Sequence, residues 1–170
     1  MRGLAAIIIA LLCCLQVAAG EDADSLRAAL MAREMAMNAP GAEAADFSIE
    51  LADGRVSALS AWRGTPVLLV LFDADCSTCA AVLRELPAVV PEGLDVLAVY
   101  AEPDDALRAA ALAEVPAGFT AGFDLTGVYG EDLYSPEFLP GVYLIDAAGI
   151  VTARGDDAGE MAVALRKIAE

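Results

Sequence analysis

Residues 67–79 read VLLVLFDADCSTC, an unbroken apolar run followed by a short acidic segment and two cysteines in C-x-x-C spacing. The run over residues 67–72 predicts a strand that is buried on both faces. Apolar side chains then recur with helical spacing from Cys79 to Leu86, so Cys79 is predicted to face the core and Cys76 to lie at the exposed tip. A helix N-terminus stabilises a thiolate, and this spacing lets the second sulfur reach the first. The segment therefore suits thiol–disulfide exchange.

The first 20 residues have the pattern of a signal peptide. Arg2 is followed by an apolar stretch over residues 4–15 and then by small residues up to Gly20. As a helix, the stretch would span roughly 18 Å, which is short of the roughly 30 Å hydrocarbon core of a membrane. We therefore predict cleavage and export to the periplasm or another extracytoplasmic compartment, with Cys13 and Cys14 lost in the peptide. A retained anchor and a lipoprotein signal are the alternatives, and only these would attach the protein to a membrane.

The mature chain would be strongly acidic. The whole chain has 10 basic and 26 acidic residues, no histidine and a net charge of −16. Loss of Arg2 leaves nine basic residues and a net charge of −17. Such a surface repels nucleic acid and anionic lipid, so neither is an expected partner.

Because a disulfide that closes so short a loop restricts the unfolded chain little, redox use explains the pair Cys76–Cys79 better than stability does.

The rest of the sequence predicts an α/β domain. A signal peptide (residues 1–20) and a helical segment (residues 21–40) precede a domain over residues 41–170. Strands are predicted over residues 47–51, 55–57, 66–72, 94–100, 141–145 and 150–154, and helices after Cys76 and over residues 104–114 and 157–169. Alternation of this kind favours a central sheet with helices on both faces. Residues 116–140 are less regular and rich in aromatic side chains.

Three segments resemble the thioredoxin-like superfamily, nearest to exported thiol–disulfide oxidoreductases of its peroxiredoxin-like, AhpC/TSA-related branch. Residues 45–64 resemble the N-terminal hairpin of that branch, residues 72–79 its active-site turn, and residues 140–149 its cis-proline strand and the hairpin that follows. The resemblance implies a thioredoxin-like fold, in which a central mixed β-sheet is flanked by helices and carries an N-terminal β-hairpin extension.

The resemblance also assigns roles. Cys76 would be the attacking thiol and Cys79 the resolving thiol, and their disulfide would serve as the redox group without any other cofactor or metal. Pro140 would follow a cis peptide bond and, with Leu139, would hold a substrate backbone by strand-like pairing. The sequence departs from thioredoxin itself, because Asp75 replaces the usual tryptophan before the first cysteine. The buried strand acid and the helix proline of thioredoxin are also absent, so a general thioredoxin is not predicted.

The acidic residues near the pair have several candidate roles. Asp75 is placed to cap a helix that begins at Cys76 by accepting from the Thr78 amide, and proton handling or simple solvation are the alternatives. Asp73 is expected in a solvent-facing loop, and Glu85 is a more remote candidate proton acceptor for Cys79. The helix N-terminus lowers the pKa of Cys76, whereas neighbouring carboxylates oppose this effect. A weakly stabilised thiolate accompanies a stable disulfide, which favours a reductase or an isomerase.

Two other classes of function compete with this interpretation. A redox-inactive thioredoxin-fold binding module would keep the fold without the chemistry. A thiol peroxidase would need Thr or Ser three residues before its reactive cysteine, and Asp73 and Cys76 occupy those positions. The predicted partners are exported proteins with disulfides or thiols, together with an electron donor.

Overall fold

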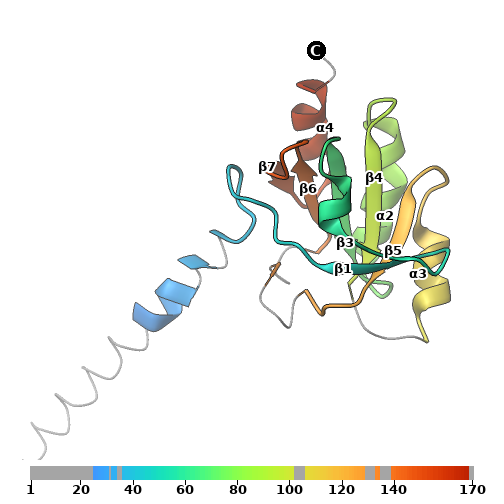
Figure 1. The fold of residues 1–170 in the computed structure, drawn as a ribbon, viewed down its shortest axis with the longest axis horizontal. Helices are drawn as coiled ribbons and strands as arrows, with labels where there is room; N and C mark the ends of the chain where they lie inside the picture. Colours follow the sequence, from blue (N-terminus) through green and yellow to red (C-terminus); the bar gives the residue numbers. More distant parts are fainter. Residues whose placement is uncertain are drawn as a thin grey trace, which may run out of the picture. The chain divides into compact units, whose positions relative to one another are not determined.

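The computed structural model divides the chain into two units, residues 1–36 and residues 37–170. In the first unit, residues 25–30 are helical, as the sequence predicts. The predicted signal peptide, including Cys13 and Cys14, lies outside the described residues and stays a prediction. None of the described helices is long and apolar enough to cross a membrane. The described residues are 25–30, 32–33, 36–101, 106–128, 133–134 and 139–168 (Figure 1).

A seven-stranded mixed sheet forms the centre of the second unit, in the order β2-β1-β5-β4-β3-β6-β7 (Figure 1). β3, β4 and β5 are parallel to one another, and the remaining pairs are antiparallel. β1 and β2 form the predicted N-terminal hairpin, which extends the sheet beyond β5. The strands are β1 (Ser48–Leu51), β2 (Val56–Ala58), β3 (Val67–Phe72), β4 (Asp95–Tyr100), β5 (Thr120–Asp124), β6 (Gly141–Ile145) and β7 (Val151–Gly155).

The central strand β3 is buried on both of its faces. Every residue of β3 and of its neighbour β6 is buried, because alternate side chains point to opposite faces and both faces are covered. The apolar run over residues 67–72 thus has the environment that its sequence predicts. The helical elements are η1 (Leu59–Trp62), α2 (Ser77–Glu85), η2 (Leu86–Ala88), α3 (Arg108–Glu114) and α4 (Ala158–Arg166).

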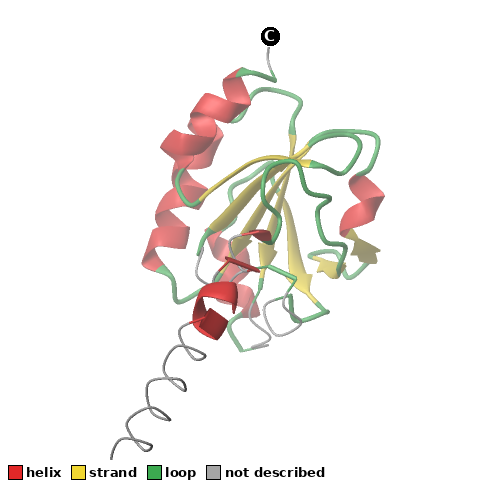
Figure 2. Cartoon of the chain, turned by 90° about the vertical axis from the view of Figure 1, so that its left-hand side faces the viewer, coloured by secondary structure: helices red, strands yellow, loops and turns green. Residues whose placement is uncertain are grey.

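The helices are distributed differently from the prediction of helices on both faces. α2, α3 and α4 all contribute to the core cluster that contains Leu68, Val70 and Phe72 of β3, so they pack on one face. The opposite face, with Leu69 and Leu71, is covered by the short helix η1 and by loops. Figure 2 shows most of the helical ribbon on one side of the sheet. Two successive parallel crossovers that move in the same direction explain why α2 and α3 share a face, since right-handed connections then lie on the same side of the sheet.

Strand β5 lies in a region that the sequence predicts to be irregular. Its residues, TAGFD, include Gly122 and have little intrinsic preference for a strand. β5 is nevertheless paired on both sides, with β4 in parallel and with β1 in antiparallel orientation. Tertiary pairing therefore determines this strand, and local propensity does not.

Candidate active site

The two cysteines lie where β3 passes into α2. Cys76 is the N-cap residue of α2, and its Sγ accepts a hydrogen bond from the backbone N–H of Cys79 at 3.1 Å. The two side chains form a disulfide, with their Cα atoms 5.2 Å apart, within the usual range. The sulfur of Cys76 thus occupies the position that a capping oxygen takes in other helices.

The two sulfurs differ in their exposure, as the helical spacing predicts. Cys79 is fully buried with Val82 and Leu83 on the face of α2 that packs against the sheet. Cys76 is half-buried at the edge of the same core cluster. An incoming reactant can therefore approach Cys76, whereas Cys79 is reached only through Cys76.

The prediction that Asp75 caps the helix is wrong. α2 begins at Ser77, so the capping position falls on Cys76, and the Cys76 sulfur caps the helix by accepting from the Cys79 amide. Asp75 is exposed, and its backbone N–H donates to Oδ1 of Asp73 at 3.4 Å. The backbone N–H of Cys76 donates to the carbonyl of Asp73 at the same distance. Asp73 therefore shapes the turn that presents Cys76.

Pro140 lies at the same edge of the sheet as the cysteine pair. The Leu139–Pro140 peptide bond is cis, as predicted. Gly141, the next residue, is opposite Leu71 in the pairing of β6 with β3, near the point where β3 leads to Cys76. Pro140 is buried, and half-buried Leu139 and Cys76 pack against the same core cluster.

Glu85 does not meet Cys79 in the structure. It is the last residue of α2 and is exposed, whereas Cys79 is buried in the first turns of that helix. Six residues of helix correspond to roughly 9 Å along the axis and place the two side chains on different sides. The geometry gives no support to Glu85 as a partner of Cys79.

Two residues that the sequence analysis did not select hold the loop before Pro140. Asn38 is buried, and its Nδ2 donates to the Leu133 carbonyl at 2.6 Å while its Oδ1 accepts from the Ala45 amide at 2.9 Å. The hydroxyl of buried Tyr134 donates to the Ala45 carbonyl at 2.9 Å. The backbone of Asn38 has a φ of 48°, a conformation in which asparagine is enriched. In the sequence, only the turn-forming segment Asn-Ala-Pro-Gly that begins at Asn38 indicated this conformation.

Burial keeps Tyr134 and its neighbour Tyr143 in their neutral forms. Desolvation raises the pKa of Tyr134 far above its ordinary value, and nearby Tyr143 and Asp46 add to the effect. Desolvation also raises the pKa of Tyr143, which Arg154 partly offsets. The rings of the two tyrosines pack edge to face, with centroids 5.1 Å apart. Tyr134 supports the loop, because its neutral hydroxyl can donate its hydrogen bond to the Ala45 carbonyl.

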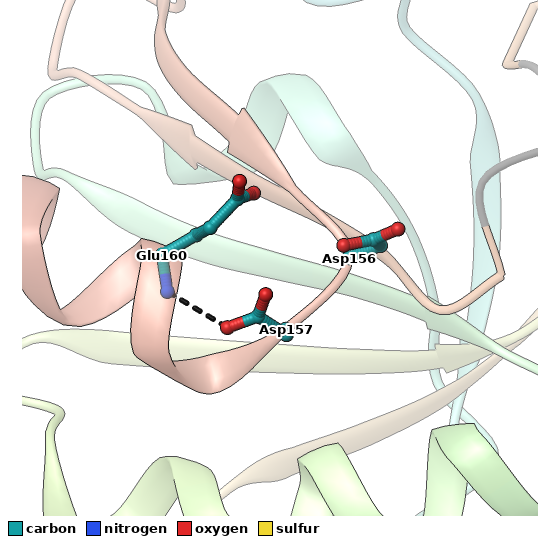
Figure 3. A group of neighbouring side chains, drawn as sticks. All are labelled: Asp156, Asp157 and Glu160. Carbon is teal, nitrogen blue, oxygen red and sulfur yellow. Dashed lines mark hydrogen bonds between the residues drawn. The ribbon is translucent and has the colours of Figure 1, made fainter.

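Three exposed carboxylates gather where β7 passes into α4. One carboxylate oxygen from each of Asp156, Asp157 and Glu160 lies within 4.8 Å of the other two (Figure 3). Asp157 is the N-cap of α4, and its Oδ1 accepts from the Glu160 amide at 2.8 Å. Helix capping accounts for Asp157, so the cluster by itself does not indicate a metal centre.

The chain is similar to known proteins over most of its second unit. A model of the AhpC/TSA family matches residues 40–154. Comparison with curated protein sequences gives no match. Among solved structures, a thioredoxin-like protein from Bacteroides caccae superimposes with a TM-score of 0.77 at 21% identity, covering 86% of this chain and 56% of that protein. This chain thus spans little more than half the length of that protein.

Two further structures match almost along their whole length. A putative thiol:disulfide interchange protein DsbE from Chlorobium tepidum is 29% identical, with a TM-score of 0.58, and the match covers 76% of this chain and 96% of that one. The thioredoxin domain of a thiol-disulfide oxidoreductase from Bacteroides vulgatus is 19% identical, with a TM-score of 0.63 and coverage of 78% and 99%. The fold is therefore thioredoxin-like, and the chain belongs to the AhpC/TSA family.

Proposed function

We propose that this protein is an exported thiol–disulfide oxidoreductase that reduces or isomerises disulfides in other proteins. The observation that carries the proposal is the arrangement of the pair: half-buried Cys76 caps α2 and is bonded to fully buried Cys79. The cis peptide bond before Pro140 at the same edge supports it. The names of the similar proteins from Chlorobium tepidum and Bacteroides vulgatus point to the same chemistry.

The reaction begins with the reduced pair. The Cys76 thiolate attacks one sulfur of a substrate disulfide, forms a mixed disulfide and releases the other substrate sulfur as a thiolate, which takes a proton from water. Cys79 then loses its proton and attacks the Cys76 sulfur, which forms the Cys76–Cys79 disulfide and releases the second substrate thiol. Two electrons pass from the protein to the substrate, and an electron donor returns the pair to the dithiol.

Specific groups assist these steps. In the reduced protein, the Cys79 backbone N–H that points at the Cys76 sulfur would stabilise the thiolate and the sulfur leaving from the mixed disulfide. We expect Leu139 and Pro140, which precede β6 at the edge that carries Cys76, to pair with a substrate backbone, and the packing of Leu139 and Cys76 on the same core cluster supports this. An extended peptide can gain main-chain hydrogen bonds by pairing with such a segment.

We expect the pair to act as a reductant and not as a strong oxidant. The chain contains no histidine, so no imidazolium stabilises the Cys76 thiolate. Asp73 and Asp75 add negative charge beside it. Equilibration with defined thiol buffers should give a potential near that of thioredoxin, about −270 mV. A value near that of a strongly oxidising periplasmic enzyme, about −120 mV, would contradict the reducing direction.

A redox-inactive binding module is the alternative, and the same titration distinguishes it. In that case the Cys76–Cys79 disulfide would be structural and would resist dithiothreitol in the folded protein. The half-buried position of Cys76 favours an exchangeable disulfide. Export rests on the pattern of the first 20 residues, and the intact mass of the protein recovered outside the cytoplasm tests it. A mass that includes the whole chain would contradict cleavage.

A further inference from the structure

Several chain connections lie at the same edge of the sheet as Cys76. The parallel strands β3, β4 and β5 all end at this edge. β6 is antiparallel to β3 and begins here, with Gly141 opposite Leu71. β7 ends here, with Gly155 opposite Val142. The connections that follow β3, β4, β5 and β7 are therefore attached around the cysteine pair, and we call this the redox edge.

Two of these connections carry acidic side chains among the residues that the structure describes. Residues 73–76 and residues 156–157 contain two acidic residues each and no lysine or arginine. The opposite edge, which is the upper one in Figure 1, carries charges of both signs. In or next to its connections lie the basic residues Arg63, Arg84, Arg166 and Lys167 and the acidic residues Glu85, Glu92, Asp95 and Asp146. The connection that carries the reactive sulfur therefore contributes only negative charge.

The two carboxylates closest to Cys76 in the chain keep their charge open to a ligand. Among the residues that the structure describes, neither Asp73 nor Asp75 forms an ion pair. Arg108 starts α3 at this edge, but its Nη2 donates to Oε2 of Glu50 at 2.7 Å and its guanidinium lies over an aromatic ring. The charge of Arg108 is therefore already opposed by Glu50.

The three carboxylates at the start of α4 add to the negative charge near Cys76. Asp156, Asp157 and Glu160 follow β7, which is separated from β3 by one strand (Figure 3). At the usual spacing between strands, β7 and β3 are roughly 10 Å apart. This is about the Debye length at ordinary ionic strength, so these carboxylates act on a charged reactant at Cys76 mainly at low salt.

We propose that the acidic redox edge selects disulfide substrates that carry positive charge. The inference rests on the proposed function, because it concerns which disulfides Cys76 attacks. The partner that fits is a protein whose disulfide has lysine or arginine beside it. Anionic disulfides, including oxidised glutathione, are disfavoured for the same reason, since like charges at close range reduce the rate of encounter.

Three small disulfides with the same two-carbon arms test the proposal. Cystamine is a dication, bis(2-hydroxyethyl) disulfide is neutral, and 3,3′-dithiodipropionate is a dianion. The rate at which each oxidises the fully reduced protein is measured by acid quenching and mass spectrometry. The informative quantity is the ratio of the cystamine rate to the dithiodipropionate rate. A change in the fraction of Cys76 present as thiolate multiplies all three rates equally and cancels from this ratio.

The variant Asp73→Asn/Asp75→Asn should lower the ratio by on the order of tenfold at low ionic strength. Raising the salt concentration to about 1 M, where the Debye length is about 3 Å, should lower the ratio for the native protein in the same way. The matched control is Glu92→Gln/Asp95→Asn, which removes two exposed acids at the opposite edge. This control should leave the ratio within about twofold of the native value, because its charges lie a strand length, roughly 20 Å, from Cys76 and act on the reactant much more weakly than Asp73 and Asp75 do.

The outcomes separate this inference from the proposed function. If all three disulfides react but neither salt nor Asp73→Asn/Asp75→Asn changes the ratio, charge selection is wrong and the oxidoreductase proposal stands. An equal fall in the control variant would also overturn it, because net charge and not the redox edge would then be responsible. If the reduced protein does not react even with the neutral disulfide, the proposed function fails and this inference fails with it.

Discussion

Replacement of Cys79 by serine is expected to stall the protein as a mixed disulfide with its substrate. Cys76 keeps its half-buried position and its hydrogen bond from the amide of residue 79, so it can still attack a substrate disulfide. The buried sulfur that would release the substrate is then absent. The native protein should show almost no mixed disulfide, whereas nearly all of the Cys79→Ser variant should be converted to the mixed disulfide. Non-reducing electrophoresis and mass spectrometry of the peptide that contains Cys76 measure the adduct.

The control for this prediction is Cys76→Ser, which should form no adduct because the remaining Cys79 thiol is fully buried. Cys79→Ala provides a second variant, since burial of the serine hydroxyl can itself lower the stability of the fold. Adducts that form through Cys79 as readily as through Cys76 would contradict the assigned order of attack. The absence of adducts in both Cys79 variants, with Cys76 reduced and folded, would contradict exchange itself.

Replacement of Gly122 by alanine is expected to destabilise the fold by about 1–3 kcal/mol, the usual cost of overpacking a core. A Cβ atom at Gly122 would lie 2.5 Å from Cγ2 of Ile49, which is fully buried in β1. Ile49 is β-branched and has little rotamer freedom, so the backbones of β1 and β5 would have to separate. Denaturant unfolding measures the change in the free energy of unfolding.

Gly155→Ala is the matched control within the same sheet. A Cβ atom there would lie 2.9 Å from Oε2 of Glu160, but that carboxylate is the far end of an exposed and flexible side chain. The free energy of unfolding of this variant should therefore stay within about 0.5 kcal/mol of the native value. Equal effects at Gly122 and Gly155 would show that the close contact with Ile49 does not limit the packing of β5.

The parts of the fold that the sequence predicts are those with a strong local pattern. The apolar run of β3 and the helical spacing after it correctly predict a buried strand and a helix that turns Cys79 inward. Asp53-Gly54 correctly predicts the hairpin between β1 and β2, where Gly54 has a φ of 82°. In these segments the local preference and the tertiary environment agree.

The remaining features depend on contacts between distant residues. β5 is a strand because β1 and β4 flank it and because Gly122 allows β1 to approach, which no local pattern reveals. The cysteine pair and the cis peptide bond before Pro140 were predicted, whereas the supporting bonds of Asn38 and Tyr134 were not. Asn38 bonds to a residue 95 positions away, so its role is visible only in the folded chain.

Asp75 illustrates the limit of the local rules near the site itself. An acidic residue directly before a helix usually provides the cap, and the sequence favours that role. The helix begins one residue later, and the sulfur of Cys76 takes the capping position. The carboxylate of Asp75 is then left exposed beside Cys76, where we propose that its charge acts on the reactants. A shift of one residue in the helix start thus changes the expected role from structure to electrostatics.

The reduction of insulin by dithiothreitol tests the central claim most directly. Catalytic amounts of the native protein should accelerate the precipitation of the reduced insulin chains, and Cys76→Ser should return the rate to that of dithiothreitol alone. This result would show that Cys76 carries the exchange reaction. Equal rates with the native protein and with Cys76→Ser, both folded, would contradict the account and favour a redox-inactive binding module.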